Sequence, residues 1–311
     1  MNPHTLIVVT GPTGVGKTAA AIALAQRLGC DIINADSRQI YRQLPIGTAA
    51  PSREEQALAR HHFVGFKDVA EAYSAAQFES DVLALLPSLW QQSSRVVMCG
   101  GSMLYIDAVC RGIDQMPDIA PAIRLAVKEK LRDEGLAALQ EELRELDPAY
   151  WSQVDLKNPS RVQHAVEVCR QTGVPFSTLR TGCAKPRPFD IVKVCLNVER
   201  EQLFDRINHR VLRMMDEGLE AEAQTMYPLR HLNALNTVGY KEMFAYFDGL
   251  MDRETAIARI QKNTRVYAKK QLTWHKKDDT MNWCRPEDLL ATVDNLLSLR
   301  VMESAAEPPA P

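Results

Sequence analysis

Apolar and polar positions alternate in two ways along the chain. In the first hundred residues, short apolar runs alternate with segments of helical periodicity. The runs predict strands at 6–10, 31–35 and 95–99, and the periodic segments predict helices at 17–28 and near 74–90. Strands that alternate with helices are typical of a parallel sheet covered by helices. We therefore expect an α/β core whose strands end along one common edge.

A complete phosphate-binding loop follows the first predicted strand. It matches the G-x-x-x-x-G-K-[ST] pattern and leads directly into the first predicted helix. In that context, backbone N–H groups and the positive end of the helix point at one place, where a phosphate chain binds. Lys17 supplies a charge for the terminal phosphates, and the Thr18 hydroxyl is placed to ligate Mg²⁺. The predicted phosphate-binding residues are Gly11, Pro12, Thr13, Gly14, Val15, Gly16, Lys17 and Thr18.

The pattern changes at about Asp118, where helical periodicity takes over as far as Gly173. Strand signals return only at 191–198, and the rest of the chain is expected to be largely helical. We interpret this as a helical insertion in a P-loop core that resembles nucleotide kinases. The last residues, rich in Ala, Pro and Glu, predict a disordered tail. The expected parts are a core of residues 1–116 and 190–302, an insertion at 117–189 and a tail at 303–311.

The composition is that of a soluble globular protein. The chain has 311 residues, of which 46% are hydrophobic and 24% charged, and its formal net charge is -2. No apolar run approaches the ~20 residues that span a bilayer, and the N-terminus lacks the pattern of a signal peptide. We therefore expect a cytoplasmic protein without a membrane partner, and a monomer by default. The seven cysteines form no C-x-x-C pair, so neither a disulfide framework nor a zinc site is indicated.

Basic residues gather near the C-terminal end although the whole chain is nearly neutral. They recur at helical intervals along one side of a predicted long helix, with few acidic residues between them. Such a stripe suits a phosphate backbone, and a solvated helix face is the alternative. The stripe consists of Arg259, Lys262, Arg265, Lys269 and Lys276, with Lys270 and Lys277 beside it.

One predicted strand ends at an aspartate that could take part in a reaction. The strand at 95–99 ends in Gly100-Gly101-Ser102 instead of the acidic residue that ATP-hydrolysing P-loop enzymes carry there. The strand at 31–35 does deliver a carboxylate, Asp36. An aspartate beside a phosphate pocket, followed by polar and aromatic side chains, indicates a base that faces an acceptor. An aspartate that organises a metal or caps a helix is the alternative.

Several ordered motifs resemble those of the tRNA dimethylallyltransferases. The resemblance extends from the P-loop to about Trp274. The segment 36–41 is similar to the family's D-S-x-Q-x-Y, 46–49 to I-G-T-A, and 100–105 to G-G-[TS]-x-L-Y. The further matching segments are 158–161, 165–168, 238–241 and 264–274.

The resemblance implies which phosphate compound the loop holds. It implies that dimethylallyl diphosphate binds there with Mg²⁺, and that its prenyl group passes to the exocyclic amine of the adenine 3′ of the anticodon. Asp36 would accept the proton of that amine, while Lys17 and Thr18 would act on the departing pyrophosphate. Arg206 or Arg210 would help to bind the pyrophosphate, and the sequence does not rank them. Helix-surface arginines paired with Asp205 or Glu217 are the alternative for these two residues.

The resemblance also implies contacts with the anticodon stem-loop of tRNA, whose target adenine would have to flip out of its stack. The family has arginine where this chain has His164, and lysine where it has Ala50. A histidine is neutral near pH 7 and binds phosphate more weakly. The implied tRNA-binding residues are Asp36, Ser37, Arg38, Gln39, Ser102, Arg124, Ser160, Arg161, Val162, Gln163, His164, Thr237, Val238, Gly239, Tyr240, Lys269, Lys270, Gln271, Leu272, Thr273, Trp274, His275 and Lys276.

Two other functions share some of these features. A small-molecule or nucleoside kinase has the same loop, a parallel sheet and a helical lid, and it would consume ATP. A non-catalytic RNA-binding protein that uses a nucleotide as a switch would share the loop and the basic stripe. These alternatives differ in whether a prenyl group is transferred to tRNA.

Overall fold

The protein consists of two compact units. The computed structural model describes residues 2–114 and 116–306. The core unit comprises Met1–Cys110 and Arg187–Pro311, and the helical unit comprises Arg111–Pro186. The helical unit thus begins and ends a few residues before the expected 117–189. The two legs of the insertion are hydrogen-bonded to each other at its base, where the Lys185 N–H donates to the Arg111 carbonyl oxygen at 2.7 Å.

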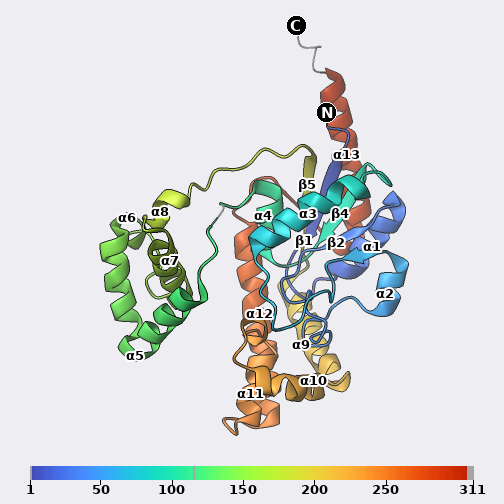
Figure 1. The fold of residues 1–311 in the computed structure, drawn as a ribbon. Helices are drawn as coiled ribbons and strands as arrows, with labels where there is room; N and C mark the ends of the chain where they lie inside the picture. Colours follow the sequence, from blue (N-terminus) through green and yellow to red (C-terminus); the bar gives the residue numbers. More distant parts are fainter. Residues whose placement is uncertain (1, 115, 307–311) are drawn as a thin grey trace. The chain divides into compact units, whose positions relative to one another are not determined.

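A six-stranded parallel sheet organises the core unit (Figure 1). The strand order is β3-β2-β4-β1-β5-β6, and β1 lies between β4 and β5. The register aligns Val8 with Met98 and Val9 with Val194. The predicted parallel α/β sheet is therefore confirmed. Its strands are β1 (Thr5–Thr10), β2 (Ile32–Asn34), β3 (His61–His62), β4 (Arg95–Cys99), β5 (Asp190–Leu196) and β6 (Met281–Cys284).

The two edge strands were not predicted. β3 has only two residues, and β6 lies in the part of the chain that was expected to be largely helical. Both edge strands lack fully buried side chains. The buried apolar run that identified the central strands is therefore missing from them, and backbone pairing with β2 and β5 decides their structure.

Helices cover both faces of the sheet (Figure 1). α1 begins and ends at the residues that the sequence pattern predicts. The core-unit helices are α1 (Lys17–Leu28), α2 (Arg53–Leu58), α3 (Ala75–Leu89), α4 (Met103–Arg111), α9 (Arg200–Asp216), α10 (Leu219–Met226), α11 (Tyr240–Phe247), α12 (Arg253–His275) and α13 (Leu289–Ala306), with short 3-10 helices η1 (Tyr227–Leu229), η2 (Asn233–Leu235) and η3 (Pro286–Asp288).

The C-terminal helix corrects one expectation. α13 continues to Ala306, so residues 303–306 are helical, whereas a disordered tail was predicted from 303. The Ala and Glu residues of this stretch favour helix and extend α13 by one turn. The rest of the predicted tail, 307–311, lies outside the described residues.

The helical unit has its own small core. Its helices are α5 (Pro121–Leu146), α6 (Pro148–Trp151), α7 (Pro159–Thr172) and α8 (Phe176–Leu179). Gly135, with φ 82°, interrupts the helical dihedral angles within α5. Val127 and Leu139, on either side of it, pack with Val166 of α7 in one buried cluster. The predicted helical insertion is confirmed as a separate hydrophobic core.

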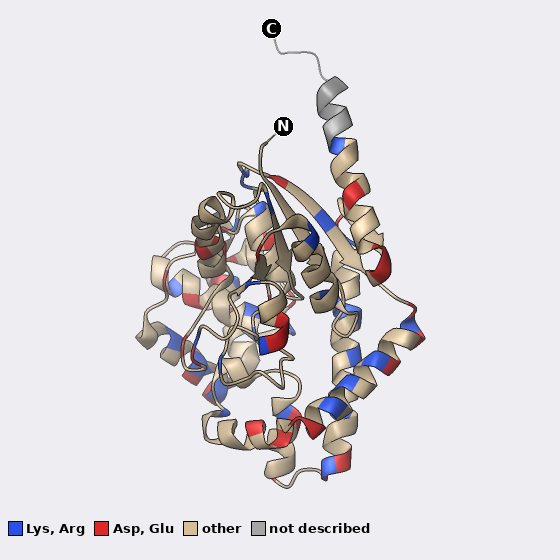
Figure 2. Ribbon diagram, turned by 90° about the vertical axis from the view of Figure 1, so that its right-hand side faces the viewer, with Lys and Arg blue, Asp and Glu red and all other residues tan. Residues whose placement is uncertain are grey.

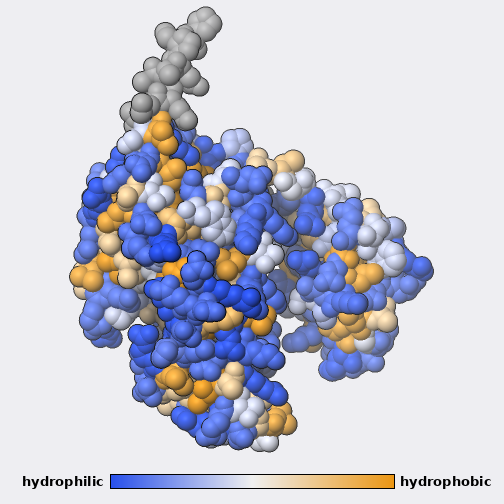
Figure 3. Space-filling view, turned by 180° about the vertical axis from the view of Figure 1, so that it is seen from behind, coloured by the Kyte–Doolittle hydropathy of each residue, from blue (hydrophilic) through white to orange (hydrophobic). Residues whose placement is uncertain are grey.

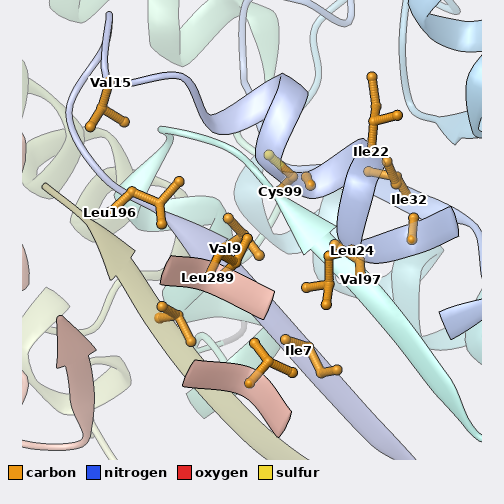
Figure 4. Close-up of a cluster of buried hydrophobic side chains, with 14 of the residues drawn as sticks. Ile7, Val9, Val15, Ile22, Leu24, Ile32, Val97, Cys99, Leu196 and Leu289 are labelled. Atoms are coloured by element: carbon orange, nitrogen blue, oxygen red, sulfur yellow. The ribbon is translucent and has the colours of Figure 1, made fainter. Parts of the chain in front are cut away.

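The main core lies between the sheet and α1, α9, α12 and α13. Ile7 and Val9 of β1 point to this side and meet Leu24 of α1 and Leu289 of α13 (Figure 4). The alternate residues of β1 are also fully buried, because helices cover the second face as well. Among the described residues, no helix is both long and apolar enough to cross a bilayer. On the face seen in Figure 3, hydrophobic residues are scattered among hydrophilic ones, as is ordinary for a protein surface.

The sheet brings three turns to one edge. In a parallel sheet, the carboxyl ends of the strands lie together. The phosphate-binding loop follows β1, Asp36 follows β2, and Gly100-Gly101-Ser102 follows β4. α1 starts directly after the loop, with Gly16 as its N-cap at φ 102°. The candidate site is therefore built on the ends of three neighbouring strands.

We expect Leu24→Ala to lower the free energy of unfolding by about 2–5 kcal/mol, because the change removes a fully buried side chain and leaves a cavity. Chemical denaturation followed by circular dichroism measures this loss. Leu250→Ala is the control, since Leu250 is 74% exposed and its truncation should cost much less. Equal losses in the two variants would contradict the packing described here.

Candidate active site

The P-loop is shaped by close packing against β5 and by Lys17. A Cβ atom at Gly11 would lie 2.5 Å from the Leu196 carbonyl oxygen, so only glycine fits there. The Lys17 ammonium donates to the carbonyl oxygens of Gly11 at 3.1 Å and Pro12 at 2.9 Å. The loop thus curls around the lysine and leaves a concave backbone in front of α1.

Burial, with the charge of Arg210 nearby, lowers the pKa of Lys17 to about 8. Cys99 and Asp36 act in the opposite direction. The ammonium form is therefore poorly solvated in the free protein and is stabilised by any anion that arrives beside it. This arrangement favours phosphate binding.

Two arginines of α9 approach the same loop. Arg206 donates to the Val15 carbonyl oxygen at 3.1 Å, and Arg210 donates to the Thr13 hydroxyl at 3.4 Å. Burial lowers the pKa of Arg210 from its ordinary value. Both predicted arginines therefore contact the P-loop, and Arg210 is the more buried of the two. Arg213, one turn further along α9, lines the same groove and was not among the predicted site residues.

Asp36 is held by its own turn. Its Oδ1 accepts hydrogen bonds from the Arg38 N–H at 2.9 Å and the Gln39 N–H at 3.4 Å. A Cβ atom at Gly101 would lie 3.9 Å from Asp36 Oδ2 and 3.8 Å from Lys17 Nζ. Gly101 therefore lies between the aspartate and the lysine without a side chain to separate them. The Asp36 carboxylate therefore lies beside the phosphate loop.

Ser102 ties this turn to β4. Its hydroxyl accepts from the Ser37 N–H at 2.7 Å and donates to the Ser37 hydroxyl at 3.0 Å. Ser102 is only 9% exposed. Its hydroxyl is thus engaged in holding the Asp36 turn, although Ser102 also lines a cavity beside Asp36.

Two cavities meet at Asp36. The larger, of about 1510 Å³, contains the P-loop with Lys17 and Thr18. The smaller, of about 540 Å³, extends along α12 and α11 and is lined by Ser37, Arg38 and Lys270. The residues that line both cavities are Thr13, Asp36, Thr48, Arg210, Met214 and Tyr267. A phosphate compound in one cavity and an acceptor in the other would therefore both reach Asp36.

The 46–49 loop forms part of the wall between the cavities. Glu222 of α10 accepts from the N–H groups of Ile46 at 2.9 Å and Gly47 at 2.8 Å. The Gln39 amide donates to the carbonyl oxygens of Thr48 at 3.1 Å and Ala49 at 2.9 Å. The Gln39 amide thus holds the loop, while the residue stays partly exposed and lines the larger cavity.

Tyr240 also supports this wall. It is fully buried, and its hydroxyl donates to Glu222 at 2.6 Å. Burial, with the Glu222 carboxylate beside it, raises the pKa of Tyr240. A Cβ atom at Gly47 would lie 2.6 Å from the Tyr240 ring, so the loop needs glycine there. The Tyr240 ring is therefore enclosed by its own core and supports the loop from inside.

The neighbours of Tyr240 lie closer to the cavity. Thr237, Val238 and Gly239 line the smaller cavity, although Gly239 itself is largely buried. The Gly239 N–H donates to Glu242 at 2.8 Å. Arg38 reaches the same region and donates to the Asn233 carbonyl oxygen at 2.9 Å. The 237–239 segment and the Asp36 turn therefore border one space.

The inward side of α12 is polar and buried. Gln271 is 1% exposed and His275 is 2% exposed. His275 Nε2 lies 3.1 Å from the Thr10 hydroxyl, and burial, with Lys17 nearby, lowers the pKa of His275 to about 4. Leu272 packs against the main hydrophobic cluster. The side chains of Gln271, Leu272 and His275 therefore face inward, and the basic periodicity of α12 does not reveal which residues between the basic positions do so.

The outward side of α12 carries the remaining predicted residues. Lys269, Lys270, Thr273, Trp274 and Lys276 are exposed, and Figure 2 colours the Lys and Arg residues blue. Lys269 Nζ lies 5.6 Å from the centre of the Phe204 ring, and Trp274 Nε1 donates to Asp107 at 3.0 Å. Lys276 lies just beyond the last residue of α12. These residues present charge and an aromatic ring to solvent.

The helical unit holds another predicted group. Arg124, Ser160, Arg161 and His164 are exposed at the surface. The His164 ring is nevertheless partly desolvated, which lowers the pKa of His164 and favours its neutral form. Val162 is fully buried, so its side chain belongs to the core of this unit. The predicted residues of this unit are Arg124, Ser160, Arg161, Val162, Gln163 and His164, of which Gln163 donates to Glu167 at 2.8 Å.

Sequence reasoning missed residues that complete the site. Tyr267 lines both cavities, and its place in a motif of the family was the one available signal. Burial and the nearby Asp36 carboxylate raise the pKa of Tyr267 to about 12. Glu222 is one of two glutamates in the short helix α10, and nothing in the sequence distinguishes it from the other.

Known proteins match this chain over most of its length. The family model described as IPP transferase matches residues 39–278. A protein named tRNA dimethylallyltransferase 2, from Porphyromonas gingivalis, is 54% identical over 295 residues, which cover 95% of this chain and 98% of that protein. Another of the same name, from Parabacteroides distasonis, is 50% identical over 293 residues, which cover 94% of this chain and 98% of that protein.

Solved structures of transferases that act on tRNA also match this chain. The full-length tRNA isopentenylpyrophosphate transferase from Bacillus halodurans has a TM-score of 0.70 at 32% identity, covering 97% of this chain and 98% of that chain. A eukaryotic dimethylallyltransferase acting on tRNA has a TM-score of 0.78 at 22% identity, covering 99% of this chain and 81% of that chain, and so shares the fold. The chain therefore belongs to the IPP transferase family, together with the proteins named tRNA dimethylallyltransferase.

Proposed function

We propose that this protein transfers the dimethylallyl group of dimethylallyl diphosphate to the exocyclic amine of the adenine 3′ of the anticodon in tRNA. Its family makes it a prenyltransferase that acts on tRNA. The donor, the target adenine and the residue roles are the proposed parts. The observation that supports them is the meeting of two cavities at Asp36, with Lys17 and Thr18 of the P-loop lining only one of them.

The P-loop side suits the leaving group. The C–O bond between the allylic carbon and the diphosphate breaks as the adenine nitrogen attacks, so negative charge grows on pyrophosphate. Lys17, Arg206 and Arg210 bring positive charge to the loop, where Arg206 and Arg210 donate to the loop itself. Fixed donors of this kind stabilise charge that develops in the transition state.

The acceptor side suits a flipped base. The amine must lie close to Asp36, which cannot be reached by an adenine that stays stacked in the anticodon loop. The smaller cavity, of about 540 Å³, opens beside Asp36 and is lined by Thr237, Tyr267 and Lys270. As the carbon–nitrogen bond forms, the amine proton becomes acidic and passes to the Asp36 carboxylate.

Magnesium fits the leaving-group side. Thr18 follows Lys17 at the start of α1 and lines the larger cavity. Among the described residues, no cluster of three or more His, Cys, Asp or Glu side chains could hold a metal ion by itself. Mg²⁺ commonly takes few protein ligands and completes its shell with phosphate oxygens and water, so one hydroxyl suffices here. When bound, Mg²⁺ would neutralise charge on the pyrophosphate.

One incubation tests the whole proposal. The protein is mixed with unmodified tRNA, dimethylallyl diphosphate and Mg²⁺, and the nucleosides of the tRNA are analysed by mass spectrometry. We expect prenylated adenosine and an equal amount of pyrophosphate. Consumption of ATP with a small acceptor, and no prenyl transfer, would instead support the kinase alternative. Binding of tRNA without any transfer would support an RNA-binding switch.

Asp36→Asn should lower kcat by about 10²–10⁴-fold, because the amide cannot accept the proton. The tRNA affinity should change little, and filter binding measures it separately. Asp31→Asn is the matched control, since Asp31 directly precedes β2. Its Oδ2 lies 2.8 Å from His62 Nε2, and it lines neither cavity. Asp31→Asn should keep kcat near that of the unchanged protein. Equal kcat values in all three proteins would remove Asp36 from the reaction.

Pyrophosphate binding should weaken as the pH rises through about 8, because the pKa of Lys17 in the free protein is about 8. Below that pH the ammonium form is present and binds the anion, and above it the neutral amine does not. Isothermal titration calorimetry with inorganic pyrophosphate and Mg²⁺ measures the affinity across this range. Lys17→Met shows which part of the pH dependence comes from other groups, including pyrophosphate itself. The same pH dependence in both proteins would contradict the prediction.

Lys270→Gln should weaken tRNA binding and reduce the slope of log K against log salt concentration by about one, because one phosphate contact is lost. Pyrophosphate affinity should stay unchanged. The matched control is Arg95→Gln, since Arg95 is exposed at the first residue of β4, the opposite end of that strand from the site. An unchanged slope for Lys270→Gln would place this lysine outside the RNA interface.

A further inference from the structure

Gln271 is a buried amide whose two ends are bound to two different loops. Its Oε1 accepts from the Thr13 N–H at 2.8 Å, and its Nε2 donates to the Gly101 carbonyl oxygen at 2.9 Å. The side chain is 1% exposed. Its side chain therefore points away from the exposed side of α12. Each end of the amide also satisfies a backbone group that would otherwise lack a partner.

The two loops carry the two sides of the proposed reaction. Thr13 belongs to the P-loop, and its hydroxyl accepts from Arg210 at 3.4 Å. Gly101 lies next to both Lys17 and Asp36, as the Cβ position at this residue shows. That same position lies 2.6 Å from Gln271 Nε2, so there is no room for a side chain at Gly101. Gln271 thus spans the narrow space between the diphosphate loop and the turn beside the base.

We propose that Gln271 is a positioning residue that sets the separation between the leaving pyrophosphate and Asp36. This inference rests on the proposed transfer reaction. The P-loop and the Gly101 turn follow β1 and β4, and the two strands are joined just before these loops, where the Gly100 N–H donates to the Val9 carbonyl oxygen at 3.2 Å and the Thr10 hydroxyl donates to the Gly100 carbonyl oxygen at 3.0 Å. The Gln271 amide continues the connection, and it comes from a helix whose other side carries Lys269 and Lys270. Misplacement by about 1 Å at a reacting centre can cost about 10²-fold in rate.

The variant Gln271→Glu tests the two-ended bond. An ionised carboxylate is an acceptor only, so the variant keeps the bond to Thr13 and loses the one to Gly101. A protonated carboxyl has one O–H donor and one carbonyl acceptor, and it restores both bonds. Because burial raises the pKa of a carboxyl group at this position, the ratio of kcat for Gln271→Glu to kcat for the unchanged protein should rise as the pH falls from about 9 to about 6, by up to about tenfold per pH unit. The charged and titratable groups around this position are Lys17, Asp36, Cys99, His275 and Arg210, and they are common to both proteins.

Gln261→Glu is the matched control. Gln261 lies on the same helix, and its amide donates to the Asn208 carbonyl oxygen of α9 at 3.2 Å, away from the P-loop. Its kcat ratio should stay flat with pH. A flat ratio for Gln271→Glu as well, with the unchanged protein active, would overturn the inference. An unchanged protein that transfers no prenyl group would instead overturn the proposed function.

Gln271→Met provides a second test that does not depend on a carboxyl group in the interior. Methionine is close to glutamine in size and makes neither hydrogen bond. We expect kcat to fall by about 10²-fold while tRNA affinity changes by less than about twofold. A loss of tRNA affinity as large as the loss of kcat, or no loss of kcat, would contradict a positioning role. This variant decides the question if Gln271→Glu fails to fold.

Discussion

Parallel pairing of β1 with β4, and of β4 with β2, is the constraint on which the rest of the structure depends. It forces the turns after these strands to one edge of the sheet, so the P-loop, Asp36 and Gly101 meet although long stretches of chain separate them. Because helices cover both faces, the strands are almost wholly apolar and leave few polar side chains on the sheet itself. The functional side chains therefore lie on the loops that follow the strands and on the helices beside them.

A few apolar residues, such as Val15, anchor those loops in the hydrophobic clusters, and polar side chains hold the rest of their backbone. Gln271 joins the P-loop to the Gly101 turn, Ser102 joins that turn to Ser37, and Glu222 holds the 46–49 loop. Each of these bonds satisfies a backbone N–H group that would be costly to leave without a partner. The same groups thus contribute to stability and set the geometry of the two cavities.

Desolvation is the main influence on the pKa values of the basic groups in this site. Burial works against the charged forms of Lys17 and Arg210, and it keeps His275 neutral. Cations that have lost water gain most from an anion that replaces it, which suits a site for pyrophosphate. The exposed lysines of α12 keep their water and interact with partners in a way that salt can screen. One protein therefore contains two kinds of positive charge with different roles.

The sequence by itself determined the central strands, α1, the P-loop, the place of Asp36 and the helical insertion, because each depends on a local pattern of apolar, glycine or capping residues. It could not determine which side of α12 faces inward, since basic residues recur around the residues that turn inward, Gln271 and His275. Nor could it identify β6 or the role of Tyr240, whose partners are distant in the chain. Only the tertiary structure decided these, because burial is a property of the packed molecule and not of any one segment.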